Sequence, residues 1–194
     1  MKIILDPAHG INTSGKRSPD GRLREYEWSR EIVNRLSDKL NELGIDNALT
    51  VSTEYEPGLR YRVIKTNQLA SLVNNDALLI SIHCNAAGAD GKWHNARGFS
   101  IWTSRGQTKS DNYAEIIFNE FEKTFPEIPV RSDTTDGDHD YESNFAVLMC
   151  TCPAVLIETL FQDNKEDVEL LLSEDFKTGF VECLANSVQL IVNS

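Results

Sequence analysis

The sequence has no long hydrophobic run and comparatively few positive charges. No stretch of about 18 consecutive apolar residues occurs, so the 194 residues contain no candidate for a transmembrane helix. The 19 Lys and Arg residues are outnumbered by 30 Asp and Glu residues, which gives a net charge of −11. Nucleic acids and anionic membranes bind clustered basic residues. We therefore expect neither a nucleic acid nor a membrane as the partner.

Cysteine is also scarce and lacks the spacing of a metal site. The four cysteines are Cys84, Cys150, Cys152 and Cys183, and no two of them form a C-x-x-C pair. A zinc site built from cysteines is therefore not expected. Cys150 and Cys152 are too close in sequence for an ordinary structural disulfide. We predict four reduced thiols, most of them packed as small hydrophobic side chains.

We expect no leader segment, linker, internal repeat or low-complexity stretch in these residues. Residues 1–6 enter a strand at once, without the long apolar segment and small-residue cleavage site of a signal peptide. We therefore expect synthesis in the cytoplasm. Hydrophobic residues make up 40% and charged residues 25%, as in an ordinary globular protein with a sizeable core. Residues 1–194 are expected to form one domain.

Three short apolar runs each end in side chains suited to metal binding or acid–base chemistry. The runs are Lys2–Leu5, followed by Asp6 and His9; Ala77–Ile82, followed by His83; and Pro153–Ile157, followed by Glu158. In open α/β sheets, ligands bind beyond the carboxyl ends of the parallel strands. If the three runs lie in one sheet, their polar side chains converge. Two histidines and carboxylates around one point suit a zinc site with an open coordination position.

Amphipathic segments alternate with these apolar runs. Helical periodicity covers about 25–43, 59–73, 110–123, 165–172 and 174–192. Alternation of helices with short strands is typical of α/β proteins. We predict a single α/β domain with a mostly parallel sheet of about six strands and helices on both faces.

Several motifs resemble those of one known family. Ile3-Ile-Leu-Asp-Pro-Ala-His9-Gly10 is similar to the "DPGHGG" opening of the zinc-dependent N-acetylmuramoyl-L-alanine amidases of the amidase-3 family, which includes bacterial cell-wall amidases and phage endolysins. Ser81-Ile-His83-Cys-Asn85 resembles "SIHAN", and Pro153-Ala-Val-Leu-Ile-Glu158 resembles "PAVLVE". Leu59-x-x-Arg62-x-x-x-x-Asn67 is similar to a further family motif. The matches follow the family order across nearly the whole chain.

The resemblance implies His9, Glu25 and His83 as zinc ligands and Glu158 as the catalytic carboxylate. Glu27 is the alternative third ligand. The family glutamate is followed after three residues by an apolar residue and after four by a small polar one, and only Glu25 has this spacing.

Two further residues near the predicted ligands have open roles. Asp6 either orients His9 or caps the turn, and Asn85 either contacts the substrate or His83 or is a plain turn residue. His94 and His139 lie in polar loops and are expected on the surface.

Three positions depart from the family pattern. Ala8 and Ile11 replace common glycines beside His9, and Leu160 replaces the glycine two residues after the catalytic glutamate. None of them removes a predicted ligand, so the departures bear on substrate fit more than on zinc binding.

The family implies hydrolysis of the amide between N-acetylmuramic acid and L-alanine in peptidoglycan. A zinc peptidase acting on the stem peptide and a non-catalytic wall-binding protein on the same fold are the alternatives. Peptidoglycan is the expected partner, the protein is expected to be a monomer, and the cell wall is the expected place of action. Both a phage-type lysin and the catalytic domain of a secreted amidase fit.

Overall fold

Six strands form one mixed sheet in the order β2-β1-β3-β6-β4-β5. The computed structural model describes residues 1–135 and 137–194. The strands are β1 (Lys2–Pro7), β2 (Asn47–Leu49), β3 (Ala77–Asn85), β4 (Ser100–Thr103), β5 (Tyr141–Glu142) and β6 (Ala154–Phe161). Strands β2, β1, β3 and β6 are parallel, and β4 runs antiparallel to β6. The predicted mostly parallel α/β sheet is confirmed.

The three apolar runs of the sequence are the three central strands β1, β3 and β6. Their residues are buried on both faces, as expected for parallel strands covered by helices on each side. The parallel register pairs Asp6 with Ser81 and His83 with Glu158. The polar residues after each run therefore meet at the carboxyl edge of one sheet.

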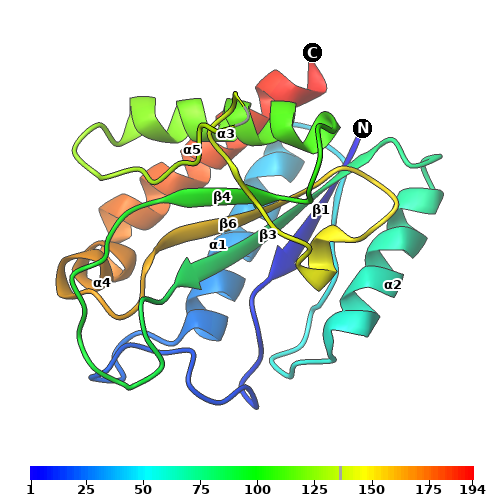
Figure 1. The fold of residues 1–194 in the computed structure, drawn as a ribbon. Helices are drawn as coiled ribbons and strands as arrows, with labels where there is room; N and C mark the ends of the chain where they lie inside the picture. The colour runs from blue at the N-terminus through cyan, green and yellow to red at the C-terminus, as the bar shows by residue number, and fades with distance from the viewer. Residues whose placement is uncertain (136) are drawn as a thin grey trace.

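Helices cover the two faces of the sheet unequally (Figure 1). Helices α1 (Glu25–Glu42), α3 (Lys109–Thr124) and α5 (Glu174–Val192) pack over one face and form the larger core. Helix α2 (Leu59–Ser71) and a short 3-10 helix, η1 (Ala146–Leu148), pack over the other. Helix α4 (Lys165–Leu172) follows β6. Among the described residues, no helix is both long and apolar enough to cross a membrane.

The turn from β6 into α4 secures the loop that follows β3. The side chain of Asn164 caps α4 by accepting the N–H groups of Glu166 and Asp167. Asp167 is fully buried and accepts hydrogen bonds from Arg97 Nε at 2.9 Å and from the Gly98 N–H at 2.9 Å. These contacts attach the 86–98 loop to the start of α4.

The edges of the sheet differ from the sequence-based expectation. The residues around 48–51 predict a strand, and the structure forms one of three residues, β2, at Asn47–Leu49. The polar, acidic segment 130–142 predicts a loop, but its last two residues form β5, which pairs with β4, and Tyr141 stacks on Trp102 of β4 with ring centroids 4.8 Å apart. Residue 136 of that loop lies outside the described residues.

Candidate metal centre

His9 follows β1 in a turn with an unusual backbone conformation. Its φ is +48°, in the left-handed region that non-glycine residues seldom occupy. Arg30 Nη2 donates to the His9 carbonyl at 2.8 Å, and Arg62 Nη2 donates to the same oxygen at 3.0 Å. Arg30 and Arg62 also bind the carbonyls of Ala8 and Pro7, respectively. Two arginines thus hold three successive carbonyls of this turn.

Glu25 is placed by the first turn of α1 and is completely buried. One helical turn later, Ser29 Oγ accepts the Ala8 N–H at 2.8 Å and donates to the Ile82 carbonyl at 2.6 Å. Ser29 therefore connects α1 to the ends of both β1 and β3. This contact brings Glu25 beside the histidines that follow the two strands.

The side chains of His9, Glu25 and His83 form one cluster. Glu25 Oε1 lies 3.3 Å from His9 Nε2 and 3.2 Å from His83 Nδ1. The nearest donor atoms of the three residues all lie within 4.8 Å of one another. The carboxylate also accepts the Cys84 N–H at 3.1 Å and Gln162 Nε2 at 3.3 Å. Three residues far apart in sequence thus present their donor atoms to a common point.

The cluster fits a tetrahedral metal ion. Zinc bonds of about 2.0–2.1 Å imply separations of about 3.3 Å between the donor atoms of a tetrahedral site, which the two Glu25–histidine distances match. His9 Nε2 is buried and has no hydrogen-bond partner among the described residues, although buried polar atoms rarely lack one. Two imidazoles and one carboxylate are also a donor set of catalytic zinc sites.

Charge favours the ionised form of the Glu25 carboxyl. Burial alone would raise its pKa, but the hydrogen bond to His83 and the charges of His83 and His9 outweigh burial and hold the pKa below its usual range. Glu25 is thus a carboxylate, the form that binds metal ions.

Glu158 lies beside the cluster on the neighbouring strand. It pairs with His83 in the parallel register of β3 and β6, so both side chains point to the same side of the sheet. Burial raises the pKa of Glu158 to about 7, against the opposing charges of His83 and Lys16. Its Oε2 atom is buried and has no hydrogen-bond partner among the described residues. An acceptor with a pKa near neutrality is suited to general acid–base chemistry.

Comparison with known proteins identifies the family. The family model described as N-acetylmuramoyl-L-alanine amidase (Amidase_3) matches residues 3–189 of this chain. The chain belongs to the Amidase_3 family. This confirms the family resemblance read from the motifs.

Relatives of this Amidase_3 chain include the N-acetylmuramoyl-L-alanine amidase AmiC of Neisseria meningitidis, which is 25% identical over 229 residues. That alignment covers 99% of the present chain but 53% of AmiC, so the chain spans about half the length of this relative.

Solved structures share the fold. An N-acetylmuramoyl-L-alanine amidase from Clostridium difficile 630 superposes with a TM-score of 0.84 at 24% identity, over 100% of this chain and 97% of that one. AmiC2 of Nostoc punctiforme superposes with a TM-score of 0.81 at 23% identity, over 100% and 98% of the two chains.

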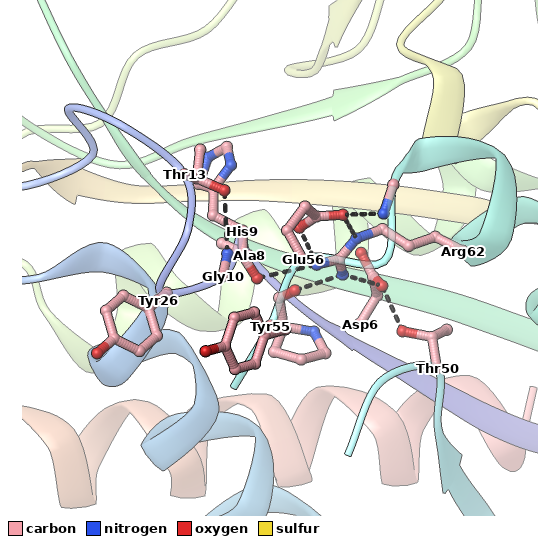
Figure 2. A network of polar contacts seen from close by, with 12 residues as sticks. Asp6, Ala8, His9, Gly10, Thr13, Tyr26, Thr50, Tyr55, Glu56 and Arg62 are labelled. Carbon is pink, nitrogen blue, oxygen red and sulfur yellow. Dashed lines mark hydrogen bonds and ion pairs between the residues drawn. The ribbon is translucent and has the colours of Figure 1, made fainter. Parts of the chain in front are cut away.

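Within this Amidase_3 domain, Arg62 is the centre of a buried ionic network (Figure 2). Its guanidinium lies between Asp6 Oδ1, at 2.7 Å, and Glu56 Oε2, at 2.6 Å. Asp6 also accepts the hydroxyls of Thr50 and Ser81. Burial opposes the charge on Arg62, but the two carboxylates more than compensate and raise its pKa. Asp6 therefore acts on the turn through Arg62, and its side chain does not contact the His9 ring.

The same turn requires glycine at position 10. A Cβ atom on Gly10 would lie 2.1 Å from the backbone nitrogen of Glu56, so any side chain would displace one of the two segments. The neighbouring Ala8 is fully buried and keeps an ordinary negative φ, so the first departure from the family pattern is tolerated. Ile11 is 44% exposed, and Leu160 is buried in the larger core.

The structure separates the sequence-predicted residues into two groups. It brings together His9, Glu25, His83 and Glu158. It places Glu27 on the exposed surface, where its carboxylate accepts the Tyr26 hydroxyl at 2.8 Å.

Among the described residues, the side chains of the remaining candidates form no hydrogen bond or ion pair with the cluster. Asn85 accepts the N–H of Ala86, as a turn residue does. His94 and His139 pair with Asp90 and Glu115 outside the cluster and are half-buried, so the expectation of surface histidines holds only in part.

Sequence reasoning missed the residues that hold the ligands. No motif indicates a role for Ser29 or Arg30, and Arg62 is only one position of a longer motif. Their partners are backbone carbonyls and amides of a distant turn, which no local pattern marks. The one available signal was that Ser29 lies one helical turn after Glu25 and so shares its face of α1.

Proposed function

We propose that the protein hydrolyses the amide bond between N-acetylmuramic acid and L-alanine in peptidoglycan, and that it uses zinc to do so. The observation that carries this proposal is the His9–Glu25–His83 cluster with Glu158 beside it, in a chain of the Amidase_3 family. Residues 1–194 would act as one catalytic domain, as a monomer, on the cell wall.

His9, Glu25 and His83 would hold the zinc ion through His9 Nε2, a Glu25 oxygen and His83 Nδ1. When bound, zinc lowers the pKa of a coordinated water towards about 7 and polarises a carbonyl under attack. Three protein ligands leave a position open for that chemistry. The hydrogen bonds from Cys84 and Gln162 hold the Glu25 carboxylate in place, as partners of metal ligands commonly do.

Glu158 would act as the general base and then as the general acid. Its free Oε2 atom accepts the proton of the attacking water, and the same carboxyl then delivers the proton to the leaving amine nitrogen. The second transfer is essential, because an amine leaves poorly unless it is protonated. A group with a pKa of about 7 can perform both transfers at neutral pH.

The test is to digest purified peptidoglycan and to identify the new end groups. The proposal expects new L-alanine amino termini, no new reducing sugar ends, and loss of both lysis and end groups after chelation. New amino termini on other stem-peptide residues would show a peptidase instead. Absence of any new end group, with zinc bound, would indicate a wall-binding protein.

A further inference from the structure

A cleft beside the metal centre carries positive charge in this otherwise acidic protein. It has a volume of about 580 Å³ and lies between the 14–19 loop and the 86–92 loop. Gln162 lies in its wall and donates to Glu25 Oε2, so the cleft adjoins the cluster. Lys16, Arg17 and Lys92 are its basic lining residues.

Lys16 and Arg17 have no acidic partner within ion-pair distance in the part of the chain that the structure describes. Arg22, only five residues after Arg17, is paired with both Asp20 and Glu169. The acidic residue of the cleft lining, Asp163, instead accepts the N–H groups of Ala87 and Gly88 at 2.8 and 3.0 Å. The cleft therefore offers two cations that are free to bind an anion.

The backbone holds Lys16 at the entrance to the metal centre. Its carbonyl accepts the Glu25 N–H at 3.0 Å, and Arg17 forms a β-bridge with Arg24. The φ of Lys16 is +31°, in the left-handed region. Non-glycine residues in this region cost free energy and cluster at ligand sites. Of the four described non-glycine residues with a positive φ, two, His9 and Lys16, lie at or beside the candidate metal centre, and the other two are Asn74 and Asn75.

The chemistry of the proposed substrate indicates which part of it the cleft would take. The lactyl carboxyl of N-acetylmuramic acid is consumed in the scissile amide, so the sugar side carries no charge there. The peptide on the other side carries carboxylates, at its end and on its acidic residues. Guanidinium and ammonium groups bind carboxylates through charge-assisted hydrogen bonds.

We propose that this cleft is the stem-peptide subsite, and that Lys16 and Arg17 bind a free carboxylate of the peptide on the leaving side of the amide. This inference rests on the proposed function. It adds a specificity: the enzyme distinguishes stem peptides with free carboxylates from those in which the carboxylates are amidated.

The experiment compares two synthetic N-acetylmuramoyl peptides that differ only in whether the peptide carboxyl groups are free or converted to carboxamides. The zinc-loaded wild-type enzyme should cleave the free-acid peptide with the higher kcat/KM. Lys16→Met and Arg17→Met should each lower kcat/KM on the free acid by about 10- to 100-fold, mainly through KM, because each removes a hydrogen bond to a charged group. On the carboxamide they should change kcat/KM by less than about threefold.

Lys109→Met is the matched control, because it removes the same charge from an exposed residue at the start of α3 that does not line the cleft. It should leave both substrates unaffected. Binding to Glu158→Gln, which should bind peptide without turning it over, gives a readout independent of catalysis. There, Lys16→Met should weaken the dissociation constant of the free-acid peptide only.

Equal kcat/KM of the wild type on the two peptides would overturn the subsite while leaving the amidase function intact. Equal losses on both peptides in Lys16→Met would also overturn it, because they would assign Lys16 a general effect on Glu158. If the wild type cleaves neither peptide at the lactyl–alanine bond, the proposed function fails and the subsite fails with it.

Discussion

The two histidines of the candidate metal centre are held by different means. His83 belongs to β3, where the pairing with Glu158 of β6 fixes its backbone within the sheet. His9 lies beyond β1, in a left-handed turn whose carbonyls bind Arg30 and Arg62. Backbone hydrogen bonds of the sheet thus position one histidine, and long charged side chains position the other.

The difference determines where each position is vulnerable. A strand register depends on many backbone hydrogen bonds, and no single side chain removes it. The His9 turn depends on the ionic network around Arg62, whose members Asp6 and Glu56 lie 56 and 6 residues away in sequence. A substitution far from the cluster can therefore displace His9 but hardly His83.

Removal of either histidine should cause the largest loss of zinc affinity. The loss should be similar for His83, which the sheet positions, and for His9, which the turn positions. His9→Ala and His83→Ala each delete one of three donors, so zinc affinity should fall by more than the 10- to 100-fold typical of supporting residues. The zinc-to-protein ratio after dialysis against a chelator measures this. His94→Ala, which removes a loop histidine bonded to Asp90, is the control. Full zinc retention in His83→Ala would refute the assignment of the ligands.

Glu158→Gln tests the residue that pairs with His83 in the sheet and leaves the three proposed zinc ligands unchanged. Gln is close to isosteric but cannot accept the proton, so turnover should fall by about 10²–10⁴, equivalent to about 2.7–5.5 kcal/mol of barrier. Zinc content and melting temperature should match the wild type. All three properties should be measured on one preparation. Normal zinc with near-wild-type lysis would remove Glu158 from the mechanism, whereas loss of zinc would make it a ligand.

Arg62→Met tests the turn side. It releases the Pro7 and His9 carbonyls, so zinc should bind about 10- to 100-fold more weakly. It also leaves Asp6 buried without its cation, so stability should fall by about 3–5 kcal/mol. Denaturant unfolding and zinc titration measure the two effects. Arg60→Met, at an exposed position of the same helix, is the control.

Arg62→Lys separates an effect on the His9 turn from a general loss of folding. Lysine keeps the charge beside Asp6 but cannot reach two carboxylates and two carbonyls together. Relative to Arg62→Met, the free energy of unfolding should therefore recover more than the zinc affinity does. A folded Arg62 variant that binds zinc as tightly as the wild type would show that the His9 turn holds its shape without the arginine.

Ser29→Ala should have the smallest effect, although Ser29 joins the two sides. Its partners, the Ala8 N–H and the Ile82 carbonyl, also bond to each other at 3.2 Å, so neither is left unpaired. We expect a loss of about 0.5–1.5 kcal/mol in unfolding free energy. Zinc affinity should change by less than about threefold. A larger loss of zinc would show that α1 positions both histidines through this hydroxyl.

Much of the sheet and the candidate cluster could be predicted from local sequence. Strands β1, β3 and β6 contain continuous apolar runs, and His9, His83 and Glu158 follow these runs. Because parallel strands present their carboxyl ends at one edge, His83 and Glu158 were expected to meet before the register was known. Glu25 was favoured over Glu27 by spacing, and the buried position of Glu25 agrees with that choice.

The remaining features depend on contacts between distant segments. Nothing within residues 7–10 indicates that His9 adopts a positive φ, because Arg30 and Arg62 hold that conformation from two separate helices. Strand β5 depends on the stacking of Tyr141 on Trp102, across 39 residues of sequence. All four cysteines are free thiols, as predicted, although the Sγ atoms of Cys150 and Cys152 lie 3.9 Å apart.

Ala8 has a consequence for the unfolded chain. The family commonly has glycine here, but Ala8 keeps a negative φ and its methyl group is fully buried. An alanine at a position that glycine is not required to fill reduces the number of conformations open to the denatured ensemble, which favours folding by about 0.4–1 kcal/mol. The residue with the left-handed backbone conformation is the next one, His9. The candidate metal site needs an imidazole there, so this position cannot be filled by a glycine, which would adopt the positive φ without strain. The segment that carries the strained histidine thus begins with a residue that lowers the entropy lost when the turn forms.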